Sequence, residues 1–263
     1  MLALIAHDRG HDMGAAVCIG LAAALKLYPA LLGVLLLADR RWKESLVCLL
    51  TGAGVTLLCL CFFREGFTEN LRTWVERTLA YTGEGNGDLA WLIDDKCSLW
   101  QLALIPMALR GDIEFIEEGM DMLGWLRVLL VAILVLAVLW SLWNRRGHDR
   151  VLMMSLLMVG FPLESGAYNL VLPVVPLVWW CAREKDSVAM PVLGGLLLGC
   201  ESFVLLSRRP YVTLQAVIHP ACIALMVLGL VLLRRRELAE SLRAVFGGRR
   251  GRADGARPGK AAV

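Results

Sequence analysis

The sequence predicts an all-α fold, a bundle of hydrophobic helices that crosses a lipid bilayer several times. Hydrophobic residues make up 58% of the 263 residues, and the mean hydropathy is +0.63, whereas an ordinary soluble domain is roughly 45–50% apolar. A spanning helix needs about 20 mostly apolar residues to cross the hydrocarbon layer. The chain contains such stretches repeatedly, at residues 14–38, 45–63, 124–143, 188–206 and 211–233.

The apolar stretch 151–181 predicts two short helices instead of one span. Four residues that disfavour a continuous apolar helix interrupt it: Pro162, Glu164, Ser165 and Gly166. We therefore expect helices over 151–162 and 167–181 that meet at a break. Because unpaired backbone groups are costly in lipid, protein or water has to cover the backbone at such a break.

The basic residues predict how the chain is threaded through the plasma membrane. Lys and Arg cluster after the predicted spans 14–38 and 124–143, after residue 181, and in the tail 234–263, which holds nine of them. Loops of this kind face the cytoplasm. Residues 64–124 instead carry twelve acidic and five basic residues and are expected to form an extracytoplasmic loop.

The chain is accordingly divided into a transmembrane helical domain, residues 1–233, and a basic cytoplasmic tail, residues 234–263. The composition of the tail, rich in Gly and Arg, predicts disorder. Its charge is expected to attract anionic membrane lipids and not nucleic acid.

Two helices are predicted within the outer loop. Over residues 67–80, apolar residues recur at helical spacing with charged residues opposite, so this helix is expected to lie flat in the membrane interface. A second helix is predicted from Ser98, whose spacing to Gln101 fits a capping box, to Leu109. It is too short to span a bilayer, so it packs on the bundle or dips into it.

The eight cysteines indicate neither a disulfide framework nor a metal site. None forms a CxxC pair, and all but Cys97 fall in or beside the hydrophobic segments. They are interpreted as small buried apolar side chains. No cofactor is expected.

Lys26 is the most informative polar residue, because it lies near the middle of the apolar stretch 14–38. A charge near the centre of a spanning helix costs about 2.5–3.5 kcal/mol. Lys26 either extends toward the interface past a kink at Pro29 or faces a cavity that holds an anionic group. The sequence leaves open whether residues 14–38 form one kinked span or a re-entrant hairpin.

Further polar residues lie near predicted helix ends. Glu164, Tyr168 and Asn169 follow Pro162 at the expected outer face, where they cap a helix or bind substrate. Glu201 and His219 lie in the last two predicted spans, where an interhelical hydrogen bond and a substrate contact are the alternatives.

The stretch GLAAALKLYPALLGVLLLADRRWK combines small residues with a Lys, a Pro and a following basic-aromatic turn. It resembles the corresponding stretch of glycosyltransferase family 87, the polyprenol-phosphate-mannose-dependent transferases. Two weaker matches follow in the expected order, CSLWQLALIPMALR and FPLESGAYNLVLPVVPL. Together they cover roughly residues 14–180, although Gly166 and Ala167 stand where the family has a different pattern.

The resemblance implies part of a GT-C-like membrane bundle. Such a bundle transfers a hexose, which is mannose in this family, from a polyprenyl-phosphate-linked donor to an acceptor on the extracytoplasmic face. Lys26 and Arg110 would bind the donor phosphate. The family's catalytic Asp lies in a first outer loop that is not recognised here, so the resemblance implies a carboxy-terminal part without an assigned catalytic residue. This part is either a fragment of a longer chain or one half of a split protein whose partner is a separate amino-terminal half. The candidate substrate-binding residues are Lys26, Tyr28, Arg110, Glu164, Tyr168, Asn169, Glu201 and His219.

Two other classes of function remain open on the sequence alone. One is a transporter or flippase, in which the break at 162–166 and Lys26 would line an anion path. The other is a noncatalytic membrane subunit that retains the helical bundle without the chemistry.

Overall fold

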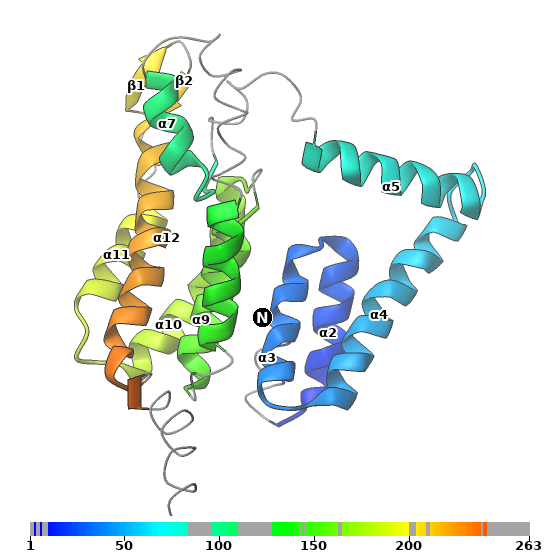
Figure 1. Ribbon diagram of the computed structural model, residues 1–263, viewed down its shortest axis with the longest axis horizontal. Coiled ribbons are helices and arrows are strands. Elements are labelled where there is room, and N and C mark those ends of the chain that lie inside the picture. The colour runs from blue at the N-terminus through cyan, green and yellow to red at the C-terminus, as the bar shows by residue number, and fades with distance from the viewer. Residues whose placement is uncertain are drawn as a thin grey trace, which may run out of the picture.

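A computed structural model of the chain describes residues 10–83, 96–109, 128–141, 146–162, 165–199, 204–208 and 211–237, together with residues 3, 6, 144, 239 and 240. Within these residues the chain is helical apart from one short β hairpin and one isolated β bridge (Figure 1). The all-α class is therefore confirmed. The predicted disorder of the tail concerns mostly residues 241–263, which lie outside the described part.

Residues 14–38 form a hairpin of short helices. Helix α2 (Asp12–Leu25) ends where Lys26 adopts an extended backbone, with φ −149° and ψ 131°. The 3-10 helix η1 (Tyr28–Leu32) and helix α3 (Gly33–Ala38) then return beside α2 (Figure 1). Of the two alternatives that the sequence left open, the structure has the hairpin. Lys26 consequently lies at the turn of the hairpin and not in the middle of a spanning helix.

Two helices among the described residues are long and apolar enough to cross a membrane: α4 (Trp42–Cys61) and α12 (Leu214–Leu233). The apolar side chains of α4 are largely exposed, among them Leu46, Leu49, Leu50, Leu57 and Leu58. A core helix of a soluble protein would bury these side chains, whereas lipid accommodates them. Other apolar helices are shorter, among them α2, the helix Val128–Ser141 and α11 (Ala189–Gly199).

Helix α5 (Phe67–Gly83) confirms the helix predicted over residues 67–80, and it runs crosswise to the bundle (Figure 1). Gly66, with a φ of 83°, makes the bend between α4 and α5, a conformation that glycine adopts at no steric cost. The Asn70 amide then donates to the carbonyl oxygens of Leu60 and Phe63, at 2.9 and 3.2 Å. These bonds satisfy carbonyl groups that the end of α4 leaves free.

Helix α9 (Gly147–Gly160) is the centre of the bundle. All its residues from Asp149 to Gly160 are buried, as expected for a helix that is apolar on nearly every side. Its apolar side chains pack against those of α10 (Val171–Arg183), of α12 and of the helix Val128–Ser141. Leu35 of α3 joins the same core, so the first hairpin packs directly on α9.

The predicted break between two short helices is confirmed. Helix α9 ends at Gly160, and the 3-10 helix η2 (Ala167–Leu170) leads into α10. The segment 96–100 covers the break: the Leu99 and Cys97 amides donate to the carbonyl oxygens of Gly160 and Ser165, both at 2.7 Å. Protein therefore satisfies the exposed backbone, which is the condition for such a break in a membrane protein.

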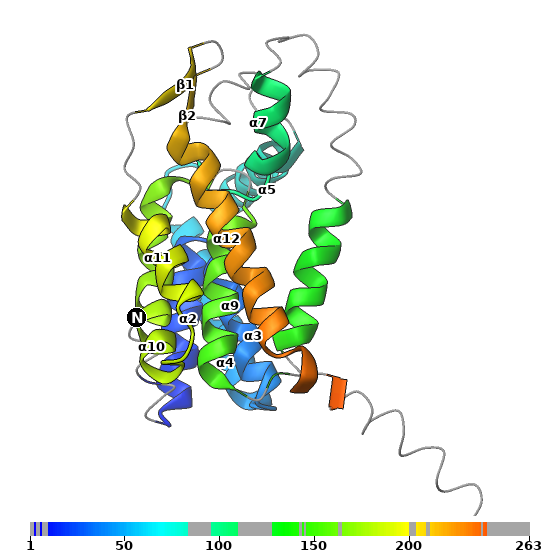
Figure 2. The ribbon, with the colours of Figure 1, turned by 90° about the vertical axis from the view of Figure 1, so that its left-hand side faces the viewer.

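The outer part of the bundle differs from the sequence prediction in two places. Helix α7 (Gln101–Leu109) begins three residues later than expected and packs on the bundle, with Trp100, Leu104 and Ile105 near Ala216 of α12. The expected span 188–206 is the shorter α11, followed by strands β1 (Leu205–Arg208) and β2 (Tyr211–Thr213) (Figure 2). An apolar run of this composition does not by itself distinguish a helix from a strand.

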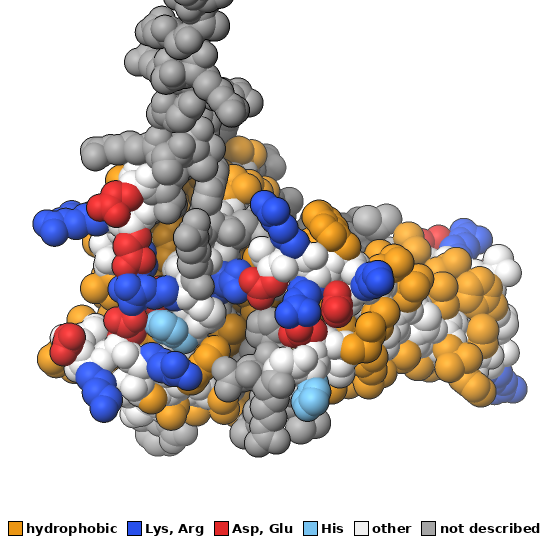
Figure 3. All heavy atoms as spheres, turned by 90° about the horizontal axis from the view of Figure 1, so that it is seen from below, with side chains coloured by type: hydrophobic (Ala, Val, Ile, Leu, Met, Phe, Trp, Pro, Cys, Tyr) orange, Lys and Arg blue, Asp and Glu red, His pale blue; other side chains and the backbone are white. Residues whose placement is uncertain are grey.

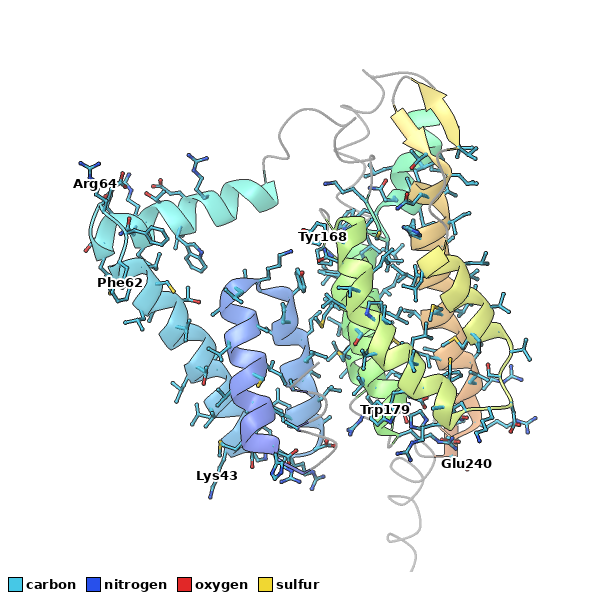
Figure 4. The ribbon with its side chains drawn as sticks, turned by 180° about the vertical axis from the view of Figure 1, so that it is seen from behind. Lys43, Phe62, Arg64, Tyr168, Trp179 and Glu240 are labelled. Atoms are coloured by element: carbon cyan, nitrogen blue, oxygen red, sulfur yellow. The ribbon has the colours of Figure 1, made fainter. Side chains whose placement is uncertain are left out.

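The basic loops of the sequence lie together at one end of the bundle, here called the charged end. Arg150 of α9 contacts Asp39 at 2.6 Å, and Arg146 contacts Glu237 at 2.7 Å. Figure 3, which looks onto this end, shows acidic and basic side chains gathered there. Lys43, Trp179 and Glu240 lie toward the charged end, whereas Tyr168 lies well away from it (Figure 4).

Candidate anion site at the hairpin turn

Lys26 and Tyr168 form the exposed part of the candidate site. The Lys26 ammonium donates a hydrogen bond to the Tyr168 hydroxyl oxygen at 3.0 Å. It also lies 4.4 Å from the ring centroid of Tyr168 and 5.4 Å from that of Tyr28, within the range of cation–π attraction. The turn after α2 and the 3-10 helix η2 thus hold one ammonium group between two aromatic rings.

Tyr28 and Asn169 form the inner part of the site. The Tyr28 hydroxyl donates to the Asn169 side-chain oxygen at 2.8 Å, and the Asn169 amide donates to the Ser165 hydroxyl at 3.2 Å. Asn169 and Ser165 are buried, whereas Lys26 and Tyr168 are exposed. Four of the eight candidate residues, Lys26, Tyr28, Tyr168 and Asn169, are therefore brought into one place.

The charge of Lys26 is not neutralised by an acid within the part of the chain that the structure describes. Its partners there are the Tyr168 hydroxyl and the rings of the two tyrosines. An exposed lysine keeps its positive charge at neutral pH. The arrangement can therefore bind an anion, with one ammonium donor and the neighbouring Tyr168 hydroxyl.

His219 lies in the interior. It is 3% exposed on α12, and its Nδ1 atom is 3.4 Å from the Cys97 sulfur. The Cys97 amide donates to the Ser165 carbonyl oxygen, and the Ser165 hydroxyl accepts a hydrogen bond from the Asn169 side-chain amide. The His219–Cys97 contact joins α12 to the segment that covers the helix break. The candidates Arg110, Glu164 and Glu201 lie outside the described residues.

A second polar cluster, at the charged end, was not predicted from the sequence. Asp149 is fully buried and accepts hydrogen bonds from Trp180 at 2.7 Å, from Arg234 at 2.8 Å and from Asn144 at 3.1 Å. Glu184 accepts from Arg234, Arg146 and His148. From the sequence, the basic residues of this cluster indicated only the orientation of the chain in the membrane. Their acidic partners lie far away in the sequence, so the ion pairs could not be recognised there.

The charged-end cluster is best described as an ion-pair network. His148, Asp149 and Glu184 bring their ligand atoms within 4.8 Å of one another, which is a spacing that a metal ion could use. However, guanidinium groups already bind one oxygen of each carboxylate, Oδ2 of Asp149 and Oε1 of Glu184. Burial acts to raise the pKa of Glu184, but the hydrogen bond from His148 and the charge of Arg234 outweigh it and hold that pKa below its ordinary value.

Comparison with known proteins identifies the family. The sequence model of glycosyltransferase family 87 matches residues 1–173, about two thirds of the chain. The match includes all four residues that meet at the hairpin turn, whereas His219 and Arg234 lie beyond it. No curated protein and no solved structure matches the chain significantly. The chain belongs to glycosyltransferase family 87, and this membership implies a membrane glycosyltransferase.

Proposed function

We propose that this chain binds polyprenyl-phosphate mannose, a hexose carried on a lipid phosphate. The chain then takes part in the transfer of that sugar to an acceptor on the extracytoplasmic face. The observation that carries the proposal is the Lys26 ammonium, which lies beside the Tyr168 hydroxyl at an exposed turn. Family membership favours a transferase over the transporter and the noncatalytic subunit.

The proposed chemistry requires a cation beside the donor phosphate. During transfer, the bond between the sugar's anomeric carbon and the phosphate oxygen breaks, and the phosphate leaves with the electron pair. The acceptor hydroxyl forms the new bond and loses its proton. Lys26 stabilises the negative charge that develops on the leaving phosphate, and an ammonium–phosphate contact is of the charge-assisted kind.

Tyr168 is suited to assist Lys26. Its hydroxyl oxygen accepts the Lys26 hydrogen bond, so its own hydrogen can be donated to a phosphate oxygen. Its side chain is 67% exposed, which leaves it accessible to a ligand. No carboxylate among the described residues contacts Lys26, so we assign donor binding, and not removal of the acceptor proton, to this site.

The position of the site in the membrane follows from the two ends of the bundle. We propose a multi-spanning bundle of the GT-C type, with the charged end and the carboxy terminus in the cytoplasm of the cell. Basic residues concentrate at that end, in agreement with the positive-inside rule. Tyr168 lies well away from the charged end (Figure 4), so Lys26 would meet the donor phosphate on the outer side of the bundle.

Binding of defined lipids to the chain in nanodiscs tests the proposal. Polyprenyl-phosphate mannose should bind saturably, and polyprenyl phosphate without sugar should compete with it. Polyprenol, which lacks the phosphate, should not compete. Competition by polyprenol as strong as that by polyprenyl phosphate would contradict recognition of the phosphate. Equal affinity for the glucose-bearing lipid would contradict the choice of mannose.

A further inference from the structure

A row of hydrogen bonds runs inward beneath the Lys26–Tyr168 pair. Tyr28 donates to Asn169, Asn169 donates to the Ser165 hydroxyl, and the Ser165 carbonyl accepts from the Cys97 amide. The row connects the hairpin turn, the helix break and the segment that covers the break. Its members become less exposed along the row: Tyr28 is half-buried, Asn169 is 4% exposed and Ser165 is 1% exposed.

Tyr28 and Asn169 lie close in sequence to the two exposed residues, Lys26 and Tyr168. Lys26 lies two residues before Tyr28, and Tyr168 lies one residue before Asn169. The Tyr28–Asn169 bond therefore joins the same two segments as the Lys26–Tyr168 bond, 141 positions apart in one case and 142 in the other. The Tyr28–Asn169 bond therefore fixes the distance between the two segments, although the bond itself is not accessible to a ligand.

We infer that Tyr28 and Asn169 are positioning residues: their hydrogen bond holds the Lys26 ammonium beside Tyr168, so that a phosphate meets both groups together. This inference rests on the proposed function of Lys26. The Asn169 amide is buried, and both its oxygen and its nitrogen already have partners, so it is not available to a phosphate.

The physical gain is preorganisation. A lysine side chain loses considerable conformational freedom when it is held in one place, and a site that is already ordered loses less on binding. The backbone near Lys26 is not held by a regular helix, because α2 ends at Leu25 and η1 begins at Tyr28. The packing of Leu32 and Leu35 against the core is independent of the Tyr28 hydroxyl, so the hairpin should persist without it.

A mutant cycle on the chain in nanodiscs tests the inference, with polyprenyl-phosphate mannose as the probe. Tyr28→Phe removes only the hydroxyl, and Asn169→Leu keeps the approximate size of the side chain without its polar groups. Each should weaken binding by about threefold to tenfold, the usual effect of one lost hydrogen bond. The double variant should bind no more weakly than Asn169→Leu alone, since that change already removes the Tyr28–Asn169 bond, together with the bond from Asn169 to Ser165.

The Lys26→Met background distinguishes positioning from direct contact. In that background Tyr28→Phe should leave the dissociation constant unchanged, because it acts only through Lys26. Thr56→Val is the matched control, since it removes a hydroxyl that bonds the Gly52 carbonyl on α4, and it should leave binding unchanged. Melting temperatures measured on the same samples establish that each variant is folded.

Each remaining outcome overturns a specific claim. If Tyr28→Phe weakens binding as much in the Lys26→Met background as in the wild-type background, Tyr28 contacts the ligand itself and the inference is wrong. If Lys26→Met weakens binding while neither Tyr28→Phe nor Asn169→Leu does, the inference fails and the proposed function stands. If Lys26→Met itself has no effect, the proposed function fails.

Discussion

The ammonium nitrogen of Lys26 lies 3.0 Å from the hydroxyl oxygen of Tyr168, although the two residues are 142 positions apart in the chain. One belongs to the turn of the amino-terminal hairpin, and the other belongs to the 3-10 helix that follows the break after α9. The site therefore depends on the packing of two parts of the bundle, and changes that displace the hairpin should also affect the site.

Gly20 lies where α2 and α4 approach each other closely. A Cβ atom there would lie 2.6 Å from the Cys48 carbonyl oxygen and 2.8 Å from the Thr51 Cβ atom. Gly20→Ala should therefore force the helices apart and lower the free energy of unfolding by about 1–3 kcal/mol, the usual effect of overpacking. Thermal unfolding in detergent micelles measures the change as a lower melting temperature.

Gly54, on α4, provides the matched control. A Cβ atom at this position would meet nothing within 4 Å, so Gly54→Ala should leave the melting temperature unchanged or raise it. Equal melting temperatures for the Gly20 and Gly54 variants would mean that α2 and α4 do not pack as closely as described.

The helix break and α5 could be predicted from the sequence because each has a local signal. Pro162, Ser165 and Gly166 interrupt an apolar run, and the spacing of apolar residues over 67–80 follows the period of a helix. The turn at Lys26 has no such signal. Hydrophobicity alone does not distinguish one long span from two short helices, and the contacts that α2 makes with η1, α3 and α4 arise only in the fold.

The charged-end network could not be predicted for a similar reason. Arg146 and Arg150 were recognisable as basic residues between helices, but their partners lie 38 and 111 positions away, at Glu184 and Asp39. The sequence identified Tyr168 and Asn169 as neighbours of the break, yet it did not indicate that they face the Lys26 turn. Pairings of this kind arise when the helices pack.

Loss of the Glu184 charge should weaken the charged end. Its pKa is lowered in the folded protein, so its contribution to stability is present above the ordinary glutamate pKa of about 4.3 and is lost as the pH falls through the lower, folded value. Glu184→Gln should lower the free energy of unfolding at pH 7 by about 1–2 kcal/mol, between the values for exposed and buried ion pairs.

Melting temperatures of wild type and Glu184→Gln, measured from pH 7 to pH 3, test this account. The difference between them should shrink toward the acid end. Glu76→Gln is the control, because its pair with Arg72 is exposed, and it should have no measurable effect. A constant difference at every pH would contradict the role of the Glu184 charge.

The proposed orientation predicts which positions a membrane-impermeant thiol reagent can reach. Glu65 lies at the bend between α4 and α5, and Asp186 follows α10 at the charged end; both are exposed. In a background without the eight native cysteines, Glu65→Cys should be labelled in intact cells and Asp186→Cys only after permeabilisation. The reverse pattern would place Tyr168 on the cytoplasmic side and contradict the orientation.

The dissociation constant of polyprenyl-phosphate mannose for the Lys26→Met variant tests the central claim most directly. This change removes the charge and keeps an apolar stem, so the protein should fold while binding weakens by roughly tenfold to a hundredfold, as expected for a charge-assisted contact of about 1.5–3 kcal/mol. Lys26→Arg should retain part of the affinity, because the charge persists in a different geometry. Lys43→Met, the same change at the charged end, should bind like wild type. A folded Lys26→Met protein with an unchanged dissociation constant would contradict the assignment of Lys26 to the donor phosphate.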